Sequence, residues 1–221
     1  MNLFDIIGPI MIGPSSSHTA GAVRLGLMAR KILGEQPDKA KISLYGSFAQ
    51  THKGHGTDLA LIAGLLGWHP DDERIPVAFD AAKETGLDFS FCCIDSEEFV
   101  HPNTAHFDLV AKNGHCCHVG GASLGGGRIM INNVDGFPVE LTGELSALLT
   151  VHEDKPGIVS MVSHILAEVG VNIASMRVFR KQKGGLAAMV IETDQTVDKK
   201  IVPIIGSRSS IKSVSLINSI L

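Results

Sequence analysis

The stretch GPSSSHTAG, residues Gly13–Gly21, is the polar segment around which the first half of the chain is organised. It is followed by apolar residues at helical spacing over 23–33. Proline cannot continue a helix backwards and serine is a favoured N-cap, so the pattern predicts a helix that begins inside this stretch. The hydroxyls and backbone N–H groups of Ser16, Ser17 and His18 should therefore gather at a helix N-terminus.

A helix start of this kind attracts anions, because its first N–H groups are unpaired and the helix dipole is positive there. A metabolite that carries a carboxylate would fit. Plain helix capping is the simpler interpretation, but one capping serine does not account for three serines, a threonine and an imidazole. We therefore predict a binding site formed by Ser15, Ser16, Ser17 and Thr19, with His18 among them.

A second polar stretch, QTHKGHGTD, covers residues 50–58 and precedes another apolar pattern at helical spacing over 59–66. The sequence predicts a loop here that opens into a helix. His55 lies between two glycines, which would let the backbone expose its ring. His55 and Thr57 are therefore further candidates for a functional site.

The remaining pattern predicts an α+β protein with two domains, at 1–143 and 147–221. Strands of the first domain are expected at 41–46, 88–94, 104–112, 116–120, 127–132 and 137–142. In the second domain, strands at 147–152, 171–180, 186–192 and 211–217 alternate with helices at 158–169 and 197–205. This order, βαββαβ, is the ferredoxin-like arrangement.

Composition excludes several classes of function. Hydrophobic residues make up 44% of the chain and charged residues 19%, which predicts a packed core rather than disorder. The basic residues are scattered and the net charge is −4, so no nucleic-acid surface is expected. No apolar run has the length of a membrane span, and the N-terminus lacks the pattern of a secretory signal, so we expect a cytoplasmic protein.

The four cysteines occur as two adjacent pairs, Cys92-Cys93 and Cys116-Cys117. Neither pair has the spacing of a zinc or thioredoxin site. Neighbouring side chains in a strand point to opposite faces, so one pair does not readily bind one metal ion. We expect all four to be reduced structural thiols.

The run LTVHEDKPGI at 149–158, followed by GVNI at 170–173, resembles an ACT domain. The resemblance implies a domain that pairs with another copy and binds an amino acid or another small effector. Carried onto this chain, it points to Asp154, Gly157 and Asn172 as effector-binding residues. A domain that only dimerises, with Asn172 serving a local turn, is an equal alternative.

Three motifs, Gly13–Gly21, Lys53–Asp58 and His101–Thr104, together resemble the beta chain of the iron–sulfur-dependent L-serine dehydratase. The resemblance covers almost the whole chain. It implies conversion of L-serine to pyruvate and ammonia, by a complex in which a partner alpha chain carries a [4Fe–4S] cluster. The absence of a spaced cysteine set here agrees with a cluster on the partner. A monovalent cation such as potassium is a further candidate cofactor, and homodimerisation through either domain is expected.

The resemblance also implies roles for single residues. His55 would take the α-proton of the substrate or orient it, with His18 as the second catalytic candidate. Ser15, Ser16, Ser17 and His18 would hold the substrate carboxylate. Thr19 is a further substrate-binding candidate, and Thr57 would hydrogen-bond the substrate. Asn103 and Thr104 are candidates for the wall of the pocket, and no residue of this chain is expected to bind metal.

Two other classes of function remain open at this point. A related fold serves as an allosteric anion-binding domain in some phosphoglycerate dehydrogenases, so the chain would then be a regulatory module that binds serine or a phosphorylated anion. A purely structural subunit is the other alternative. The two polar, glycine-containing segments around His18 and His55 favour catalysis, because a structural subunit has no need of them.

Overall fold

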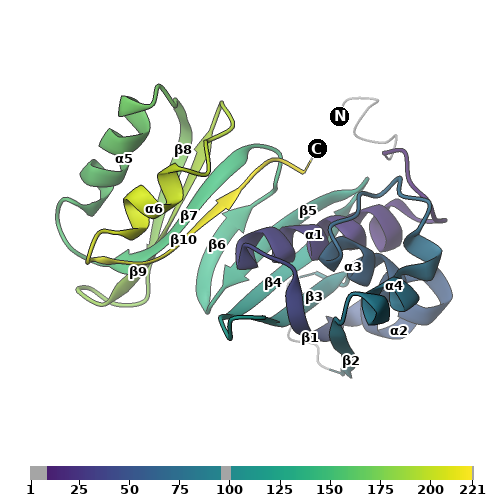
Figure 1. Ribbon diagram of the computed structural model, residues 1–221. Helices are drawn as coiled ribbons and strands as arrows, with labels where there is room; N and C mark the ends of the chain where they lie inside the picture. Colours follow the sequence, from purple (N-terminus) through teal and green to yellow (C-terminus); the bar gives the residue numbers. More distant parts are fainter. Residues whose placement is uncertain (1–8, 96–100, 221) are drawn as a thin grey trace. The chain divides into compact units, whose positions relative to one another are not determined.

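The computed structural model describes residues 9–95 and 101–220 (Figure 1). By its internal contacts the chain divides between Asp135 and Gly136 into two compact units. Each unit contains helices and strands, which confirms the predicted α+β class.

The strands of the first unit belong to one sheet in the order β2-β1-β3-β4-β5-β6, whose last strand, β6 (Phe137–Leu141), follows the point at which the chain divides. Strands β1 and β2 are parallel, and the other neighbours as far as β5 are antiparallel. Parallel strands need a crossover connection, which α2, α3 and α4 provide here. The elements are η2 (Ser16–Ala20), α1 (Gly21–Leu33), β1 (Pro37–Tyr45), α2 (Gly46–His55), α3 (Thr57–Leu65), η3 (Ile75–Val77), α4 (Ala78–Glu84), β2 (Asp88–Ile94), β3 (Thr104–Ala111), β4 (Cys116–Gly125) and β5 (Arg128–Val134).

Helix α1 packs against this sheet through its apolar face. In β1, the alternate residues Ala40, Ile42 and Leu44 are buried, as expected for a strand with one face on the core. Leu25 of α1 is fully buried, and its Cδ2 lies where a side chain on Gly121 of β4 would stand. The hydrophobic core of the first unit therefore lies between the helices and one face of the sheet.

Helices α1 and α3 lie side by side and approach closely through two glycines (Figure 1). A Cβ atom on Gly26 of α1 would lie 2.2 Å from the carbonyl oxygen of Leu61. A Cβ atom on Gly64 of α3 would lie 2.1 Å from the carbonyl oxygen of Val23. Only glycine allows the two backbones this separation, so the pair fixes the distance between the helices.

The structure corrects the prediction of a loop at residues 50–58, because most of this segment is helical. Helix α2 runs through Gly54 and ends at His55, and only Gly56, with a φ of 67°, breaks the chain before α3. The fully buried Phe48 anchors the helix, while its polar residues occupy the outer side. The polar, glycine-containing composition concealed this amphipathic helix.

The second unit contains a four-stranded antiparallel sheet in the order β10-β7-β9-β8. Helices α5 and α6 both lie on one side of this sheet (Figure 1) and share one apolar core with it. This arrangement confirms the predicted ferredoxin-like βαββαβ fold. The elements are β6 (Phe137–Leu141), β7 (Ser146–Glu153), α5 (Ile158–Glu168), β8 (Ile173–Arg180), β9 (Leu186–Thr193), α6 (Ile201–Gly206) and β10 (Ile211–Ile217).

Strand β6 makes two side-chain contacts within this unit: Glu140 pairs with Arg177, and the Lys181 ammonium lies over the Phe137 ring. One detail of the second unit differs from the sequence-based expectation. Helix α6 begins at Ile201 rather than near 197. Pro203 then falls in the first turn, where its missing N–H costs no hydrogen bond.

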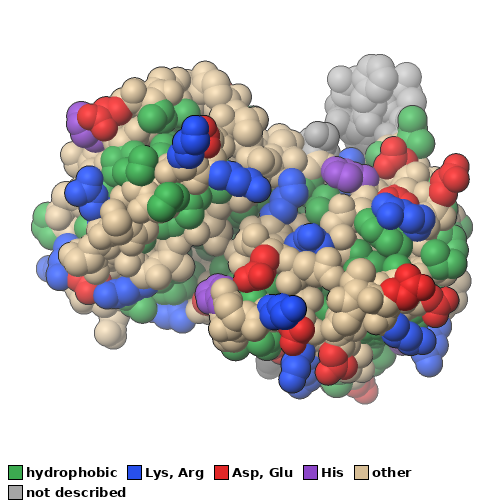
Figure 2. Space-filling model, viewed as in Figure 1, with side chains coloured by type: hydrophobic (Ala, Val, Ile, Leu, Met, Phe, Trp, Pro, Cys, Tyr) green, Lys and Arg blue, Asp and Glu red, His purple; other side chains and the backbone are tan. Residues whose placement is uncertain are grey.

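The surface carries charges of both signs. On the face drawn in Figure 2, Lys and Arg side chains are interspersed with Asp and Glu, in agreement with the scattered basic residues of the sequence. Within the described ranges, no helix has the length and apolarity needed to cross a membrane.

Candidate functional site

The first helix begins at Ser15, as the sequence predicts. Ser15 has an extended backbone, and its hydroxyl accepts a hydrogen bond from the backbone N–H of His18 at 3.2 Å. The carbonyl of Ser15 accepts from the N–H of Thr19 at 2.8 Å. The next turn, η2, is a π-helical turn that leads directly into α1, closed by a bond from the Gly21 N–H to the Ser16 carbonyl. Three serines and His18 therefore surround the start of one continuous helix.

The ring of His18 is held between two hydroxyls. Its Nδ1 lies 3.4 Å from the Ser15 Oγ, and its Nε2 lies 3.2 Å from the Ser47 Oγ in the first turn of α2. The ring also meets Phe48 edge-on, at 5.3 Å between centroids. These contacts come from two elements that are about thirty residues apart in the sequence, so the fold positions this imidazole.

His55 meets His18 in space, which the sequence alone does not show. Their rings make an edge-to-face contact with 4.8 Å between centroids. His55 is the last residue of α2 and is exposed. Burial lowers the pKa of His18 below its usual value, and repulsion by His55 lowers that pKa further. The electrostatics therefore favour a neutral His18 at neutral pH.

Two threonine hydroxyls near these helix starts are buried and have no hydrogen-bond partner in the part of the chain that the structure describes. They are the Oγ1 atoms of Thr19 and of Thr57, the first residue of α3. Thr57 is fully buried. An unpaired buried hydroxyl costs free energy, and a ligand that accepts or donates a hydrogen bond there would recover it.

The third motif joins the first through Ser123 of β4. The Ser123 Oγ donates to the carbonyl of Ser17 at 2.9 Å, and its N–H donates to the carbonyl of Asn103 at 3.0 Å. The Asn103 Nδ2 lies 3.5 Å from the Ser123 carbonyl. Thr104 instead turns its hydroxyl to the carbonyl of His101 at 2.5 Å. The structure thus brings Asn103 to the serine stretch, whereas the Thr104 hydroxyl serves a local turn.

Two helix N-termini converge at this site. Helix α3 begins two residues after His55, and η2 and α1 begin around His18. Further along the two helices, the close contact between Gly26 of α1 and Gly64 of α3 keeps α1 and α3 side by side. Their positive ends therefore face the same region, which favours a bound anion. Asp58, in the first turn of α3, partly offsets this charge and accepts a hydrogen bond from the Leu59 N–H at 2.9 Å.

Ser47 and Ser123 are the site residues that sequence reasoning missed. Ser123 sits in the middle of a buried strand with no motif around it. Ser47 follows Tyr45-Gly46 at the end of β1 and shows no periodic pattern of its own. The one available signal for Ser47 is Gly46, whose φ of 54° marks a sharp turn from strand to helix.

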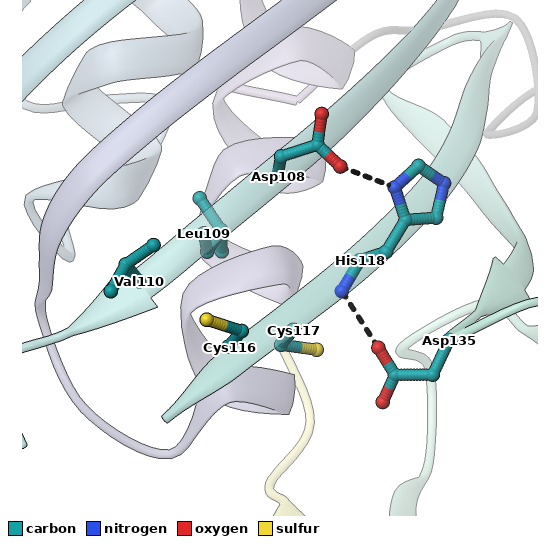
Figure 3. Close-up of a pocket in the computed structure, with 7 residues that line it drawn as sticks. All are labelled: Asp108, Leu109, Val110, Cys116, Cys117, His118 and Asp135. Carbon is teal, nitrogen blue, oxygen red and sulfur yellow. Dashed lines mark hydrogen bonds and ion pairs between the residues drawn. The ribbon is translucent and has the colours of Figure 1, made fainter. Parts of the chain in front are cut away.

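A pocket of about 250 Å³ lies elsewhere in the first unit, on β3 and β4 (Figure 3). Figure 3 shows Asp108 and His118 pointing toward one another, with 2.7 Å between Oδ1 and Nδ1. Asp135 accepts from the backbone N–H of His118 at 2.8 Å. Both carboxylates are thus engaged, and none of the predicted site residues lines this pocket.

The cysteines are free thiols, as expected. Burial of the Cys117 thiol raises its pKa to about 12, so it stays protonated. Among the described residues, no group of three or more histidine, cysteine or acidic side chains is arranged to hold a metal ion. The donors present in these ranges therefore do not fit an iron–sulfur cluster, which needs a set of converging thiolates.

The predicted effector residues of the second unit do not meet within one chain. Asp154 follows β7 and accepts from the Gly184 N–H at 3.0 Å, and Arg180 lies 3.3 Å from the same carboxylate. Gly157 is the N-cap of α5. Asn172 donates from its Nδ2 to Asp194 at 2.6 Å. Asp154 thus lies at the Leu186 end of β9, and Asn172 lies at the Thr193 end.

Comparison with known proteins accounts for both units. The serine dehydratase beta chain model matches residues 2–135, and the ACT domain model matches residues 146–208. A Bacillus subtilis (strain 168) protein named "Probable L-serine dehydratase, beta chain" is 45% identical over 216 residues, which is 98% of this chain and 97% of that protein. The L-serine dehydratase beta chain of Peptoniphilus asaccharolyticus is 37% identical over 198 residues, covering 90% of this chain and 89% of that one.

A third relative carries a different name. D-3-phosphoglycerate dehydrogenase of Synechocystis sp. (strain ATCC 27184 / PCC 6803 / Kazusa) is 31% identical over 175 residues, which is 78% of this chain but 31% of that protein. The fold and site define a two-domain protein that joins a polar site at converging helix starts to an ACT domain. More narrowly, the chain belongs to the serine dehydratase beta chain family.

Proposed function

We propose that this chain is one subunit of an L-serine dehydratase, which converts L-serine to pyruvate and ammonia. The observation that carries the proposal is the edge-to-face contact of His18 and His55 beside a serine-bearing helix start. Membership of the serine dehydratase beta chain family supports the same reaction. The proposal includes an alpha chain as partner, with the substrate enclosed between the two chains.

The proposed roles follow from the chemistry of each group. The N–H groups and hydroxyls at Ser15, Ser16 and Ser17 hold the substrate carboxylate at the positive end of the helix. His55, exposed at the end of α2, removes the α-proton as general base. The buried, unpaired hydroxyl of Thr57 hydrogen-bonds the substrate.

The overall reaction balances without a further reactant. Loss of the α-proton and of the β-hydroxyl releases one water molecule and leaves aminoacrylate. Tautomerisation gives an imine. Hydrolysis of that imine consumes one water molecule and yields pyruvate and ammonia. In this proposal the [4Fe–4S] cluster belongs to the alpha chain, and a monovalent cation such as potassium is a further candidate.

The test is reconstitution of this chain with its alpha chain under anaerobic conditions, followed by assay of pyruvate formation from L-serine. His55→Ala should lower kcat by about 10²–10⁴-fold, as expected for loss of a general base. His52→Ala is the matched control, because His52 lies on the same helix and its Nδ1 faces the Ala49 carbonyl at 3.0 Å. Turnover of His55→Ala at the wild-type rate would refute the assignment.

A second candidate is a regulatory module that binds serine or a phosphorylated anion. The similarity to a D-3-phosphoglycerate dehydrogenase over 78% of this chain favours it. Calorimetric titration of the chain alone with L-serine and with inorganic phosphate distinguishes the two. Tight binding without the alpha chain, together with unchanged kcat on assembly of His55→Ala, supports the regulatory module.

A further inference from the structure

Ser47 occupies a position that the proposed mechanism does not yet use. Its Oγ lies 3.2 Å from the Nε2 of His18, while the Ser15 Oγ lies 3.4 Å from the other ring nitrogen. Both nitrogens of this imidazole are therefore engaged by hydroxyls. By contrast, none of the hydrogen bonds among the described residues involves the ring of His55.

The hydrogen-bond directions along this row depend on the tautomer of His18. The Ser15 Oγ accepts the backbone N–H of His18 and has one hydrogen to donate. When that hydrogen is donated to the ring Nδ1, the neutral imidazole carries its proton on Nε2, and this N–H donates to the Oγ of Ser47. In this tautomer, on which the proposal below depends, His18 is a donor toward Ser47 and not a base.

Ser47 is itself held rigidly. It lies in the first turn of α2, where its carbonyl accepts from the Thr51 Oγ1 at 2.8 Å. The next residue, Phe48, is fully buried, donates its N–H to the Pro102 carbonyl at 3.3 Å and meets the His18 ring edge-on. A hydroxyl on a fixed helical turn, beside a buried aromatic ring, can define the orientation of an imidazole.

We propose that Ser47 is a positioning residue, whose hydroxyl fixes the ring of His18 so that His18 in turn orients the exposed ring of His55. The inference rests on the proposed function for its catalytic consequence, but its structural part does not. The two histidines then have different roles. Both ring nitrogens of His18 contact serine hydroxyls, whereas the ring nitrogens of His55 remain available to the substrate.

Charged groups on the neighbouring elements do not offer another explanation for the state of His18. Apart from burial, only His55 lowers its pKa. The other titratable or charged residues of the elements in contact with η2 are His52 and Lys53 on α2, Asp58 on α3, Arg24, Arg30 and Lys31 on α1, and Cys116, Cys117 and His118 on β4.

The first measurement uses the full chain alone, labelled with ¹⁵N, and does not depend on activity. A hydrogen bond slows the exchange of a ring N–H with water, so the wild type should show a ring N–H resonance that is absent in His18→Gln. We expect Ser47→Ala to lose this resonance. Ser47→Thr, which keeps a hydroxyl, and Gln50→Ala, at an exposed position of the same helix, should retain it. Retention of the resonance in Ser47→Ala would overturn the inference.

The second measurement uses the chain assembled with its alpha chain. A displaced catalytic group costs up to about 10²-fold in rate, so Ser47→Ala should lower kcat by about 10- to 100-fold with little change in KM. Ser47→Thr should recover most of that loss, whereas Gln50→Ala should match the wild type. If Ser47→Ala is fully active while His55→Ala is not, the positioning role is refuted and the proposed function stands. If His55→Ala is fully active, the proposed function fails, and the ring resonance alone decides the role of Ser47.

Discussion

The two units differ in whether polar residues that are separated in the sequence come together in space. In the first unit, segments far apart in the sequence meet: His18 contacts His55, and Asn103 reaches the serine stretch through Ser123. In the second unit, Asp154 and Asn172 lie only eighteen residues apart in the sequence but at opposite ends of β9. Closeness in sequence is therefore a poor guide to a shared site, and topology decides.

The physical cause is the kind of element that links the residues. Two helices locked by glycines bring their starts to one place in the first unit. An extended strand does the reverse, because β9 has eight residues and a strand rises about 3.3 Å per residue, so its ends are roughly 23 Å apart. A site that used both Asp154 and Asn172 would need residues from a second copy of the chain.

The largest expected effect tests whether His18 and His55 act as one unit. In the assembled enzyme, His18→Ala and His55→Ala should each lower kcat strongly, by about 10²–10⁴-fold for His55. The double variant should lose little more than His55→Ala alone, because residues that act together are not additive. His164→Ala, on α5 of the second unit, should leave kcat unchanged. Losses that multiply in the double variant would show two independent residues.

The next effect concerns the helix pair that brings the motifs together. Gly64→Ala places a Cβ 2.1 Å from the Val23 carbonyl oxygen and should destabilise the chain by about 1–3 kcal/mol. Gly54→Ala is the matched control, because nothing lies within 4 Å of its Cβ position in α2. That change should stabilise the chain by about 0.5–1 kcal/mol through helix propensity. Urea unfolding measures both, and equal effects would contradict the close contact.

A smaller effect separates a ligand-binding hydroxyl from a structural one. Thr57→Val removes a buried hydroxyl that has no partner and should raise the unfolding free energy by about 1 kcal/mol. The same change should raise KM for L-serine. In the second unit, Thr150 is also fully buried, but its hydroxyl lies 3.4 Å from the Nδ1 of His152. Thr150→Val should therefore lower stability, and melts of both variants with L-serine kinetics provide the check.

The smallest expected effect lies at Asp154, which is a surface residue. Its hydrogen bond from the Gly184 N–H and its ion pair with Arg180 hold its pKa below the usual value. A lowered pKa means that the stabilisation is fully present above the unfolded-state pKa, near 3.8, and is lost as pH falls through the folded-state pKa. The Tm of Asp154→Asn should lie slightly below that of the wild type near neutral pH, and the gap should close as the pH falls through the lowered folded-state pKa of Asp154. A gap independent of pH would contradict this origin.

Much of the fold follows from local pattern. Strand alternation and glycine-bounded apolar runs locate β2, β7, β9 and β10 within a residue or two, and a helix begins inside the stretch 13–21 as predicted, with Ser15 as its N-cap. Helix α2 escaped prediction because one buried aromatic residue, Phe48, anchors it while glycines interrupt its sequence. Local composition does not show that one buried side chain is sufficient to hold a helix against the core.

The site was predictable in its residue types but not in its geometry. Ser15, His18 and His55 stand in motifs that show polar, exposed chemistry. The contact between the two imidazoles depends on the crossing of α1 and α3, which Gly26 and Gly64 set from deep in the apolar pattern. Ser47 and Ser123 act through single hydroxyls, and a lone serine leaves no periodic trace in a sequence.

The π-helical turn at Ser16–Ala20 has a consequence for insertions and deletions. It spans one residue more than an ordinary helical turn, and each residue in a helix corresponds to about 100° of rotation. Removing one residue here would let α1 continue as a regular helix, but would swing Ser15 and the chain before it around the axis. A deletion of one residue would therefore keep α1 helical but move the Ser15 hydroxyl away from the His18 ring, so that the ring would no longer lie between the hydroxyls of Ser15 and Ser47.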